Sequence, residues 1–241
     1  MKNLLHIQSL KAWYGPAQIL FEINLRVNSG ECVALLGRNG AGKSTLVKSI
    51  MGLVQRQAHS FQFLNQDASN WATDQLVRAG MAYVPEDRRI FTNLTVLENL
   101  KVGRPQHHVL GDGRAAPQWE LKDVLELFPR LQNMLNRSAS QMSGGEQQML
   151  SIARSLMVNP LLLLLDEPTE GIAPVLVQQM SQAILQLKSQ GVSVLLSEQN
   201  WAFASRVCDR AYVLQKGQVV FNGNMSDIQH NKLAQDALWV L

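Results

Sequence analysis

Residues 32–44 read CVALLGRNGAGKS, an apolar run of five residues followed by a glycine-rich loop. The run Cys32–Leu36 predicts a buried strand of a parallel sheet, because such strands are apolar on both faces. Apolar residues recur at helical spacing from Lys43 to Met51, which predicts a helix directly after the loop. Strand, loop and helix in this order are typical of an α/β fold with a mainly parallel sheet.

The loop matches the pattern G-x-x-x-x-G-K-[ST], in which backbone amides at the start of a helix surround phosphate groups. Glycines let the backbone approach a phosphate closely. We expect Lys43 to contact the β- and γ-phosphates of ATP, and Ser44 to be a ligand of Mg²⁺. The predicted phosphate site consists of Gly37, Arg38, Asn39, Gly40, Ala41, Gly42, Lys43, Ser44 and Thr45.

A second apolar run, Leu161–Leu165, is followed directly by the carboxylates Asp166 and Glu167. Ligands of parallel sheets bind at the carboxyl ends of the strands, so this run predicts a strand that carries both side chains into the site. We expect Asp166 to hold Mg²⁺, directly or through water. Glu167 is the predicted catalytic base, which accepts a proton from the attacking water.

The rest of the chain alternates between strand and helix patterns without a linker, so one domain over 1–241 is predicted. The segment from about 87 to 160 carries only helical patterns and is predicted to be a helical subdomain inserted in the α/β core. The other expected strands are 4–10, 19–27, 192–196, 211–214 and 218–221, the last two forming a hairpin, and the other expected helices are 120–128, 146–158, 173–190 and a C-terminal one after Ser226.

Composition excludes several classes of protein. The 241 residues are 46% hydrophobic and 17% charged, which is typical of a folded globule rather than a disordered chain. The net charge is +3 without a block of five like charges, so no nucleic-acid partner is expected. No apolar run approaches the roughly 18 residues of a membrane span, and no secretory signal is present, so a cytoplasmic chain is expected. Cys32 and Cys208 are predicted to be buried thiols.

The segment Ser143-Gly144-Gly145-Glu146 lies shortly before the second apolar run and has the chemistry of another anion site. Ser143 is a hydroxyl donor and a helix N-cap, and the glycines leave backbone amides accessible at the positive end of the next helix. With this segment, the chain resembles the nucleotide-binding subunits of ABC transporters. Their usual signature is L-S-G-G-Q, whereas Met142 and Glu146 replace the leucine and the glutamine here.

The resemblance implies an α/β P-loop ATPase core with an antiparallel β-subdomain and a helical subdomain. It also implies a head-to-tail dimer with two ATP molecules at the interface, in which Ser143, Gly144, Gly145 and Glu146 contact the ATP held by the other subunit. The second subunit is either another copy of this chain or a paralogue. The family's further partners are transmembrane permease subunits on the inner face of the cell membrane and, indirectly, a periplasmic solute-binding protein.

The resemblance assigns three more site residues. Tyr14, or the adjacent Trp13, matches the aromatic residue that stacks on adenine. Glu86 stands where the family usually has a glutamine, and its carboxylate offers oxygen to Mg²⁺ or water. Gln199 stands where the family usually has a histidine that touches the γ-phosphate, and its amide can donate a hydrogen bond but does not titrate near neutral pH.

The departures from the family pattern favour one branch. Val-Pro-Glu at 84–86, Arg-Arg-Ile-Phe at 88–91 and Glu-Gln-Asn at 198–200 resemble the LivF-type ATPases of branched-chain amino-acid importers. Thr-Glu-Gly-Ile at 169–172 also resembles the ATPase of urea and short-amide importers, which remains the alternative. A non-transport ABC ATPase is less favoured, because those usually carry a coiled-coil insertion or a second cassette. In the family, the region of Arg88, Arg89 and Phe91 lines the groove that receives a permease helix.

Overall fold

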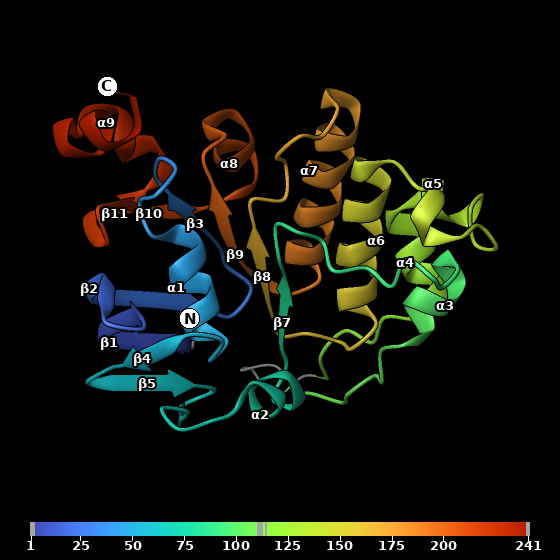
Figure 1. Ribbon diagram of the computed structural model, residues 1–241, viewed down its shortest axis with the longest axis horizontal. Helices are drawn as coiled ribbons and strands as arrows, with labels where there is room; N and C mark the ends of the chain where they lie inside the picture. Colours follow the sequence, from blue (N-terminus) through green and yellow to red (C-terminus); the bar gives the residue numbers. More distant parts are fainter. Residues whose placement is uncertain (1–2, 110–112, 114, 240–241) are drawn as a thin grey trace.

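The computed structural model describes residues 3–109, 113 and 115–239. The chain folds into two β-sheets with helices around them (Figure 1). The larger sheet has six strands, and all neighbours are parallel except the hairpin β10–β11 at one edge. In spatial order its strands are β11 (Gln218–Asn224), β10 (Arg210–Gln215), β3 (Cys32–Leu36), β9 (Ser193–Glu198), β8 (Leu162–Asp166) and β7 (Met81–Val84).

The central strands of this sheet are buried on both faces, as the apolar runs predicted. In β3, Cys32, Ala34 and Leu36 belong to one hydrophobic cluster, whereas Val33 and Leu35 belong to another. Successive side chains of a strand point to opposite faces, which explains this division. The first cluster includes α6 (Gly144–Leu156), α7 (Pro174–Ser189) and α8 (Trp201–Val207), and the second includes α1 (Lys43–Ile50) and the smaller sheet.

The smaller sheet is antiparallel and packs on the same side of the larger sheet as α1. Two long strands dominate it, and both extend beyond the predicted segments 4–10 and 19–27. Three short strands complete it, and the sequence patterns did not predict them. Its strands are β1 (Asn3–Tyr14), β2 (Ala17–Asn28), β4 (Gln55–Gln57), β5 (Ser60–Phe63) and β6 (Gln66–Asp67).

In the described part of segment 87–160, the regular elements are helices joined by loops, with two isolated bridges besides, and Figure 1 shows its first helices on the opposite side of the molecule from the smaller sheet. Its elements are α3 (Val96–Lys101), α4 (Leu121–Leu127), α5 (Pro129–Gln132), the 3₁₀ turn η1 (Ala139–Gln141) and α6. Elsewhere the chain forms α2 (Thr73–Arg78), the 3₁₀ turn η2 (Met225–His230) and α9 (Lys232–Trp239).

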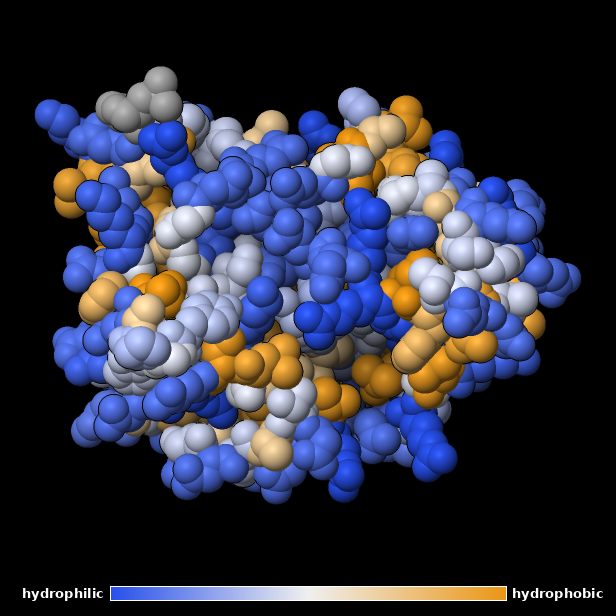
Figure 2. All heavy atoms as spheres, viewed as in Figure 1, coloured by the Kyte–Doolittle hydropathy of each residue, from blue (hydrophilic) through white to orange (hydrophobic). Residues whose placement is uncertain are grey.

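The surface is mostly hydrophilic on the face that Figure 2 shows, with hydrophobic residues in several patches, among them one at the lower centre and one on the right, towards α3. Exposed apolar side chains of this part of the chain include Phe91 and Val102. Across the residues that the structure describes, no helix has both the length and the apolar character that crossing a membrane requires.

Candidate nucleotide site

The candidate site lies at the carboxyl edge of the larger sheet, where β3, β9 and β8 are neighbours. Leu36 is paired with Glu198, and Asp166 is paired with Ser197, so the three strands end at the same level. The phosphate loop, the segment after Asp166 and the segment after Glu198 therefore meet, although they are far apart in the sequence. This is the edge at which parallel sheets bind their ligands.

The phosphate loop ends at Gly42, which precedes α1 and has φ +106°. An added Cβ at Gly42 would lie 2.9 Å from Leu20 Cδ2 and would force that side chain to move. This conformation and the close approach of β2 explain why glycine stands here. The N-terminus of α1 then points its free backbone amides into the site, which favours an anion.

The Lys43 ammonium is buried inside the loop, with only 3% of the residue exposed. Its Nζ donates to the carbonyl oxygens of Gly37 (2.9 Å) and Arg38 (3.2 Å). The same atom forms an ion pair with Glu167 Oε1 at 2.9 Å. The predicted phosphate ligand and the predicted base are therefore direct partners in this structure.

Glu167 adopts a left-handed backbone conformation, with φ +45°. Such conformations are uncommon outside glycine and occur at functional sites. The turn is held by the Glu167 amide, which donates to the Ser197 carbonyl (2.9 Å). Gln199 Nε2 donates to Glu167 Oε2 (2.9 Å), so the carboxylate has Lys43 on one oxygen and Gln199 on the other.

The pKa values of two carboxyl groups at this turn are shifted in opposite directions. Burial acts to raise the pKa of Glu167, but the hydrogen bonds from Lys43 and Gln199 outweigh it and the pKa is lowered from its ordinary value. The pKa of Glu170 is raised, chiefly because its carboxyl group shares a hydrogen bond with Glu167. Of the two groups, Glu167 is therefore the one that ionises first as the pH rises, which suits a base.

Asp166, the last residue of β8, directly precedes Glu167 and is 1% exposed. Ser44 Oγ donates to Asp166 Oδ1 (2.9 Å), and the Tyr83 hydroxyl donates to Oδ2 (3.3 Å). Burial raises the pKa of Asp166, although the hydrogen bonds from Ser44 and Tyr83 oppose this shift. The hydroxyl and the carboxylate present neighbouring oxygen ligands, the donor type that Mg²⁺ prefers, so these residues fit that ion.

A hollow of about 470 Å³ lies in front of these groups. It brings together most of the predicted phosphate loop with Glu86 and Glu167, and a smaller hollow of about 340 Å³ lies beside Gly37, Arg38, Asn39 and Gln199. The larger one is lined by Ile19, Asn39, Gly40, Gly42, Lys43, Ser44, Thr45, Glu86, Glu167 and Glu170. Ala41 belongs to the same loop but is buried, with its amide bonded to the Arg38 carbonyl (3.1 Å).

The structure does not bring the signature segment or Tyr14 into this hollow. Ser143 is the N-cap of α6 and forms a capping box with Glu146: the Ser143 amide donates to Glu146 Oε2 (2.8 Å), and the Glu146 amide donates to Ser143 Oγ (3.4 Å). An added Cβ at Gly145 would lie 2.3 Å from Leu176 Cδ1, so α7 requires glycine there. Tyr14 is 47% exposed at the end of β1, and Trp13 beside it is half-buried.

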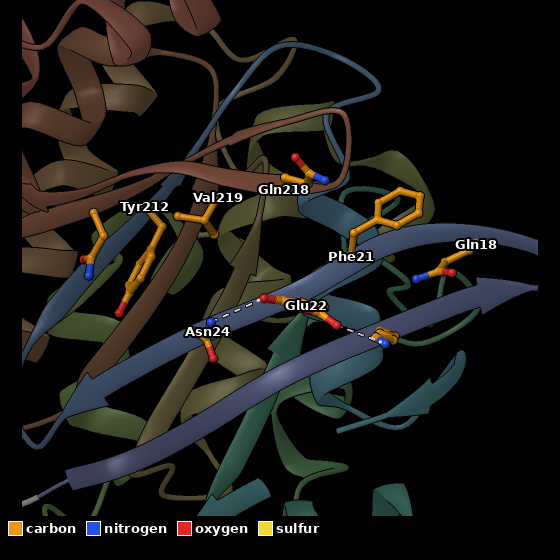
Figure 3. Close-up of a pocket in the computed structure, with 9 residues that line it drawn as sticks. Gln18, Phe21, Glu22, Asn24, Tyr212, Gln218 and Val219 are labelled. Atoms are coloured by element: carbon orange, nitrogen blue, oxygen red, sulfur yellow. Dashed lines mark hydrogen bonds and ion pairs between the residues drawn. The ribbon is translucent and has the colours of Figure 1, made fainter. Parts of the chain in front are cut away.

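A different hollow, of about 690 Å³, lies between β2 and the hairpin β10–β11 (Figure 3). Gln18, Phe21, Tyr212 and Gln218 contribute to its lining. The ion pair between Lys11 and Glu22 crosses part of its wall at 3.1 Å. None of the predicted site residues lines it, so the two hollows at the carboxyl edge of the sheet remain the candidate site.

Three residues of the site were missed by the motif patterns. Ile19 and Glu170 line the main hollow. Glu198 accepts hydrogen bonds from Thr169, in the segment after β8, and from Gln199, in the segment after β9. Glu170 and Glu198 lie inside the segments 169–172 and 198–200, which were used only to compare branches of the family, so an acidic residue within these segments was the available signal. Ile19 carries no chemical signal in the sequence, because only the packing of β2 against the loop places it there.

The parallel sheet, the phosphate loop and the paired carboxylates define a P-loop ATPase. Residues 20–170 match the family model described as ABC transporter, and the chain belongs to this family. It is 41% identical to the high-affinity branched-chain amino acid transport ATP-binding protein BraG of Pseudomonas aeruginosa, over 97% of this chain and 98% of the relative.

Two further comparisons support this assignment. The chain is 32% identical to the lipopolysaccharide export system ATP-binding protein LptB of Escherichia coli K12, over 92% of this chain and 90% of the relative. The crystal structure of a nucleotide-free ATP-binding cassette from an ABC transporter matches with a TM-score of 0.82 and 25% identity, over 99% of this chain and 98% of the other. The chain is therefore an ATP-binding and ATP-hydrolysing subunit of an ABC transporter, and its fold is the predicted one.

Proposed function

We propose that this chain powers an importer of branched-chain or other hydrophobic amino acids by hydrolysing ATP at the site described above. The observation that carries the hydrolytic part is the contact of Lys43 and Gln199 with the two oxygens of Glu167. The proposed solute class rests on the 41% identity with BraG over nearly the whole of both chains, which exceeds the 32% identity with LptB.

In the proposed reaction, ATP enters the main hollow with its phosphates against the amides of the loop and of α1. Lys43 binds the β- and γ-phosphates, and Glu167 then accepts a proton from the water that attacks the γ-phosphorus. The bond between this phosphorus and the bridging oxygen breaks, and ADP and phosphate leave. Gln199 holds Glu167 in place and donates to the γ-phosphate.

We propose that Ser44 and Asp166 hold Mg²⁺, with Glu86 close enough in the same hollow to offer oxygen to the ion or to a water. The ion, when bound, would neutralise negative charge on the β- and γ-phosphates. Ser44 and Asp166 exchange their mutual hydrogen bond for this role. Tyr14 is the proposed adenine contact, with Trp13 as the alternative, and its exposed ring is free to stack on a flat ligand.

Replacing Gln199 with alanine is expected to slow hydrolysis less than replacing Glu167. The substitution removes one hydrogen bond to the base and one to the phosphate, but it leaves the base and Lys43 in place. Measured turnover should fall about tenfold, which corresponds to the loss of a hydrogen bond to a charged group. A loss as large as that of Glu167→Gln would show that Gln199 does more than contact the γ-phosphate.

The proposed assembly is a head-to-tail dimer, with this chain or a paralogue as the partner, docked on permease subunits at the inner face of the membrane. A single chain leaves Ser143 and the N-terminus of α6 outside its own hollow, which supports their proposed use on the partner's ATP. The exposed Phe91, over which the Arg154 guanidinium lies at 5.0 Å, supports a docking role for this part of the helical segment.

The solute class is tested by uptake. Cells that lack this chain are expected to lose uptake of labelled leucine, isoleucine and valine, and wild-type chain but not Glu167→Gln should restore it. Selective loss of urea uptake would support the alternative importer branch instead. Unchanged uptake of all these solutes, with a defect in export, would overturn the importer assignment while leaving the ATPase intact.

A further inference from the structure

Glu198, the last residue of β9, accepts four hydrogen bonds although it is only 2% exposed. Its Oε1 accepts from the Thr169 amide (3.2 Å) and from Thr169 Oγ1 (2.6 Å). Its Oε2 accepts from the amides of Gln199 (3.1 Å) and Asn200 (3.0 Å). One buried carboxylate therefore joins the segment after β8 to the segment after β9.

All four partners are donors, so only an ionised carboxylate, which has no proton of its own, satisfies the whole set. Burial raises the pKa of Glu198 above its ordinary value, and the hydrogen bonds from Thr169, Asn200 and Gln199 reduce this shift without cancelling it. A buried charge is expensive unless it is well bonded. Among the described residues, the Glu198 carboxylate accepts its hydrogen bonds from these two segments alone.

The two segments flank the catalytic pair. Thr169 lies two residues after Glu167, and Gln199 follows Glu198 directly. Gln199 Nε2 and Glu167 Oε2 close the arrangement at 2.9 Å. These links form a closed ring. Hydrogen bonds join Gln199 to Glu167 and Thr169 to Glu198, and the chain itself joins Glu198 to Gln199 and Glu167 to Thr169.

We propose that Glu198 is a positioning residue for ATP hydrolysis: it holds the segment after β8 against the segment after β9 and so fixes Gln199 relative to Glu167. This inference rests on the proposed role of Glu167 as the base. Glu198 itself touches neither Lys43 nor the oxygens of Glu167 within the described contacts, so it acts through its two partners.

Glu31, the residue directly before β3, provides a matched control. It is also largely buried and accepts four hydrogen bonds, from the amide and side chain of Asn28 (2.8 and 3.0 Å) and from the guanidinium of Arg210 (2.5 and 3.2 Å). Leu36 is paired with Glu198, and Glu31 lies five residues before Leu36. At the rise of a strand this places Glu31 about 16 Å from Glu198, at the opposite end of the strands. It therefore reports the cost of neutralising a buried glutamate far from the site.

The test compares Glu198→Gln with Glu31→Gln in ATP hydrolysis by the purified full chain. A glutamine turns an amide toward one pair of donors and so loses two of the four hydrogen bonds. We expect Glu198→Gln to lower kcat about tenfold with KM for ATP changed less than about twofold, because phosphate binding by Lys43 is untouched. Glu31→Gln should change kcat by less than about twofold. Equal loss of kcat in both variants would overturn the proposal.

A double-mutant cycle asks whether Glu198 acts through Gln199. In a Gln199→Ala background there is no side chain to position, so Glu198→Gln should lower kcat further by less than about twofold. The same tenfold loss in both backgrounds would overturn the proposal. Independent, additive losses are what a merely structural role of Glu198 predicts.

Substitutions of Thr169 provide a second test of the proposal if Glu198→Gln does not fold. Thr169→Val removes the hydroxyl that donates to Glu198 Oε1 and should lower kcat about fivefold, whereas Thr169→Ser keeps that donor and should restore kcat. Equal kcat in the valine and serine variants would overturn the proposal. Absence of hydrolysis by the wild-type chain would instead refute the proposed function, so the two failures are distinguishable.

Discussion

Replacing Glu167 with glutamine is expected to lower ATP hydrolysis by at least about 100-fold, the usual contribution of a positioned general base. Glutamine keeps the size of the side chain and can still contact Lys43 and Gln199, so the shape of the hollow should survive. It cannot accept a proton from water at neutral pH. ATP should therefore stay bound, and the ATP-bound dimer should accumulate.

The measurement combines ATP turnover with the molecular mass of the chain in the presence of ATP and Mg²⁺. Glu22→Gln is a suitable control, because it is the same chemical change at a side chain that is 66% exposed on β2 and paired only with Lys11 among the described ion pairs. The control should hydrolyse ATP at the wild-type rate. Wild-type turnover in Glu167→Gln would remove Glu167 from the mechanism.

The second large effect is expected for Lys43→Ala, which should weaken ATP binding about 100-fold. Among the described residues that line the main hollow, Lys43 carries the only ammonium, and its removal also leaves the carboxylate of Glu167 without its cation. The acidic or basic residues that still line the hollow would then be the glutamates Glu86, Glu167 and Glu170. Both changes act against an anionic ligand.

Calorimetric titration of the full chain with ATP and Mg²⁺ measures this loss. Lys122→Ala removes the same charge from a side chain that is 71% exposed on α4, and its affinity should equal that of the wild type. If Lys43→Ala bound ATP as tightly as this control, the backbone amides of the loop would have to supply the phosphate affinity alone.

Sequence patterns predicted the parts of the fold that repeat simple rules. The apolar runs before Gly37 and Asp166 became β3 and β8 because both faces of the central sheet are covered. The strand expected at 192–196 became β9, and the helix expected at 173–190 became α7. These segments also carry the phosphate loop and the carboxylates, which is why their convergence could be expected from the order of strands in parallel sheets.

Other features depend on contacts between distant segments and carry no local pattern. Strands β4, β5 and β6 are two to four residues long, and pairing with β1 and with one another defines them. Cys32 and Cys208 are buried and unbridged as predicted, but their Sγ atoms lie 3.3 Å apart, which their separation in sequence did not suggest. The contacts of Glu198 with Thr169 likewise exist only once β8 and β9 are paired.

The ion pair between Lys43 and Glu167 gives the protein an internal counter-ion in place of the phosphates. In the proposed mode of ATP binding, entry of the nucleotide would be an exchange, in which one anion replaces another at the same ammonium and the carboxylate is released. The hydrogen bond and charge of Lys43, which lower the pKa of Glu167, are withdrawn at that moment, so the carboxylate becomes more basic. The substrate itself thereby activates the base, and an empty site keeps it neutralised.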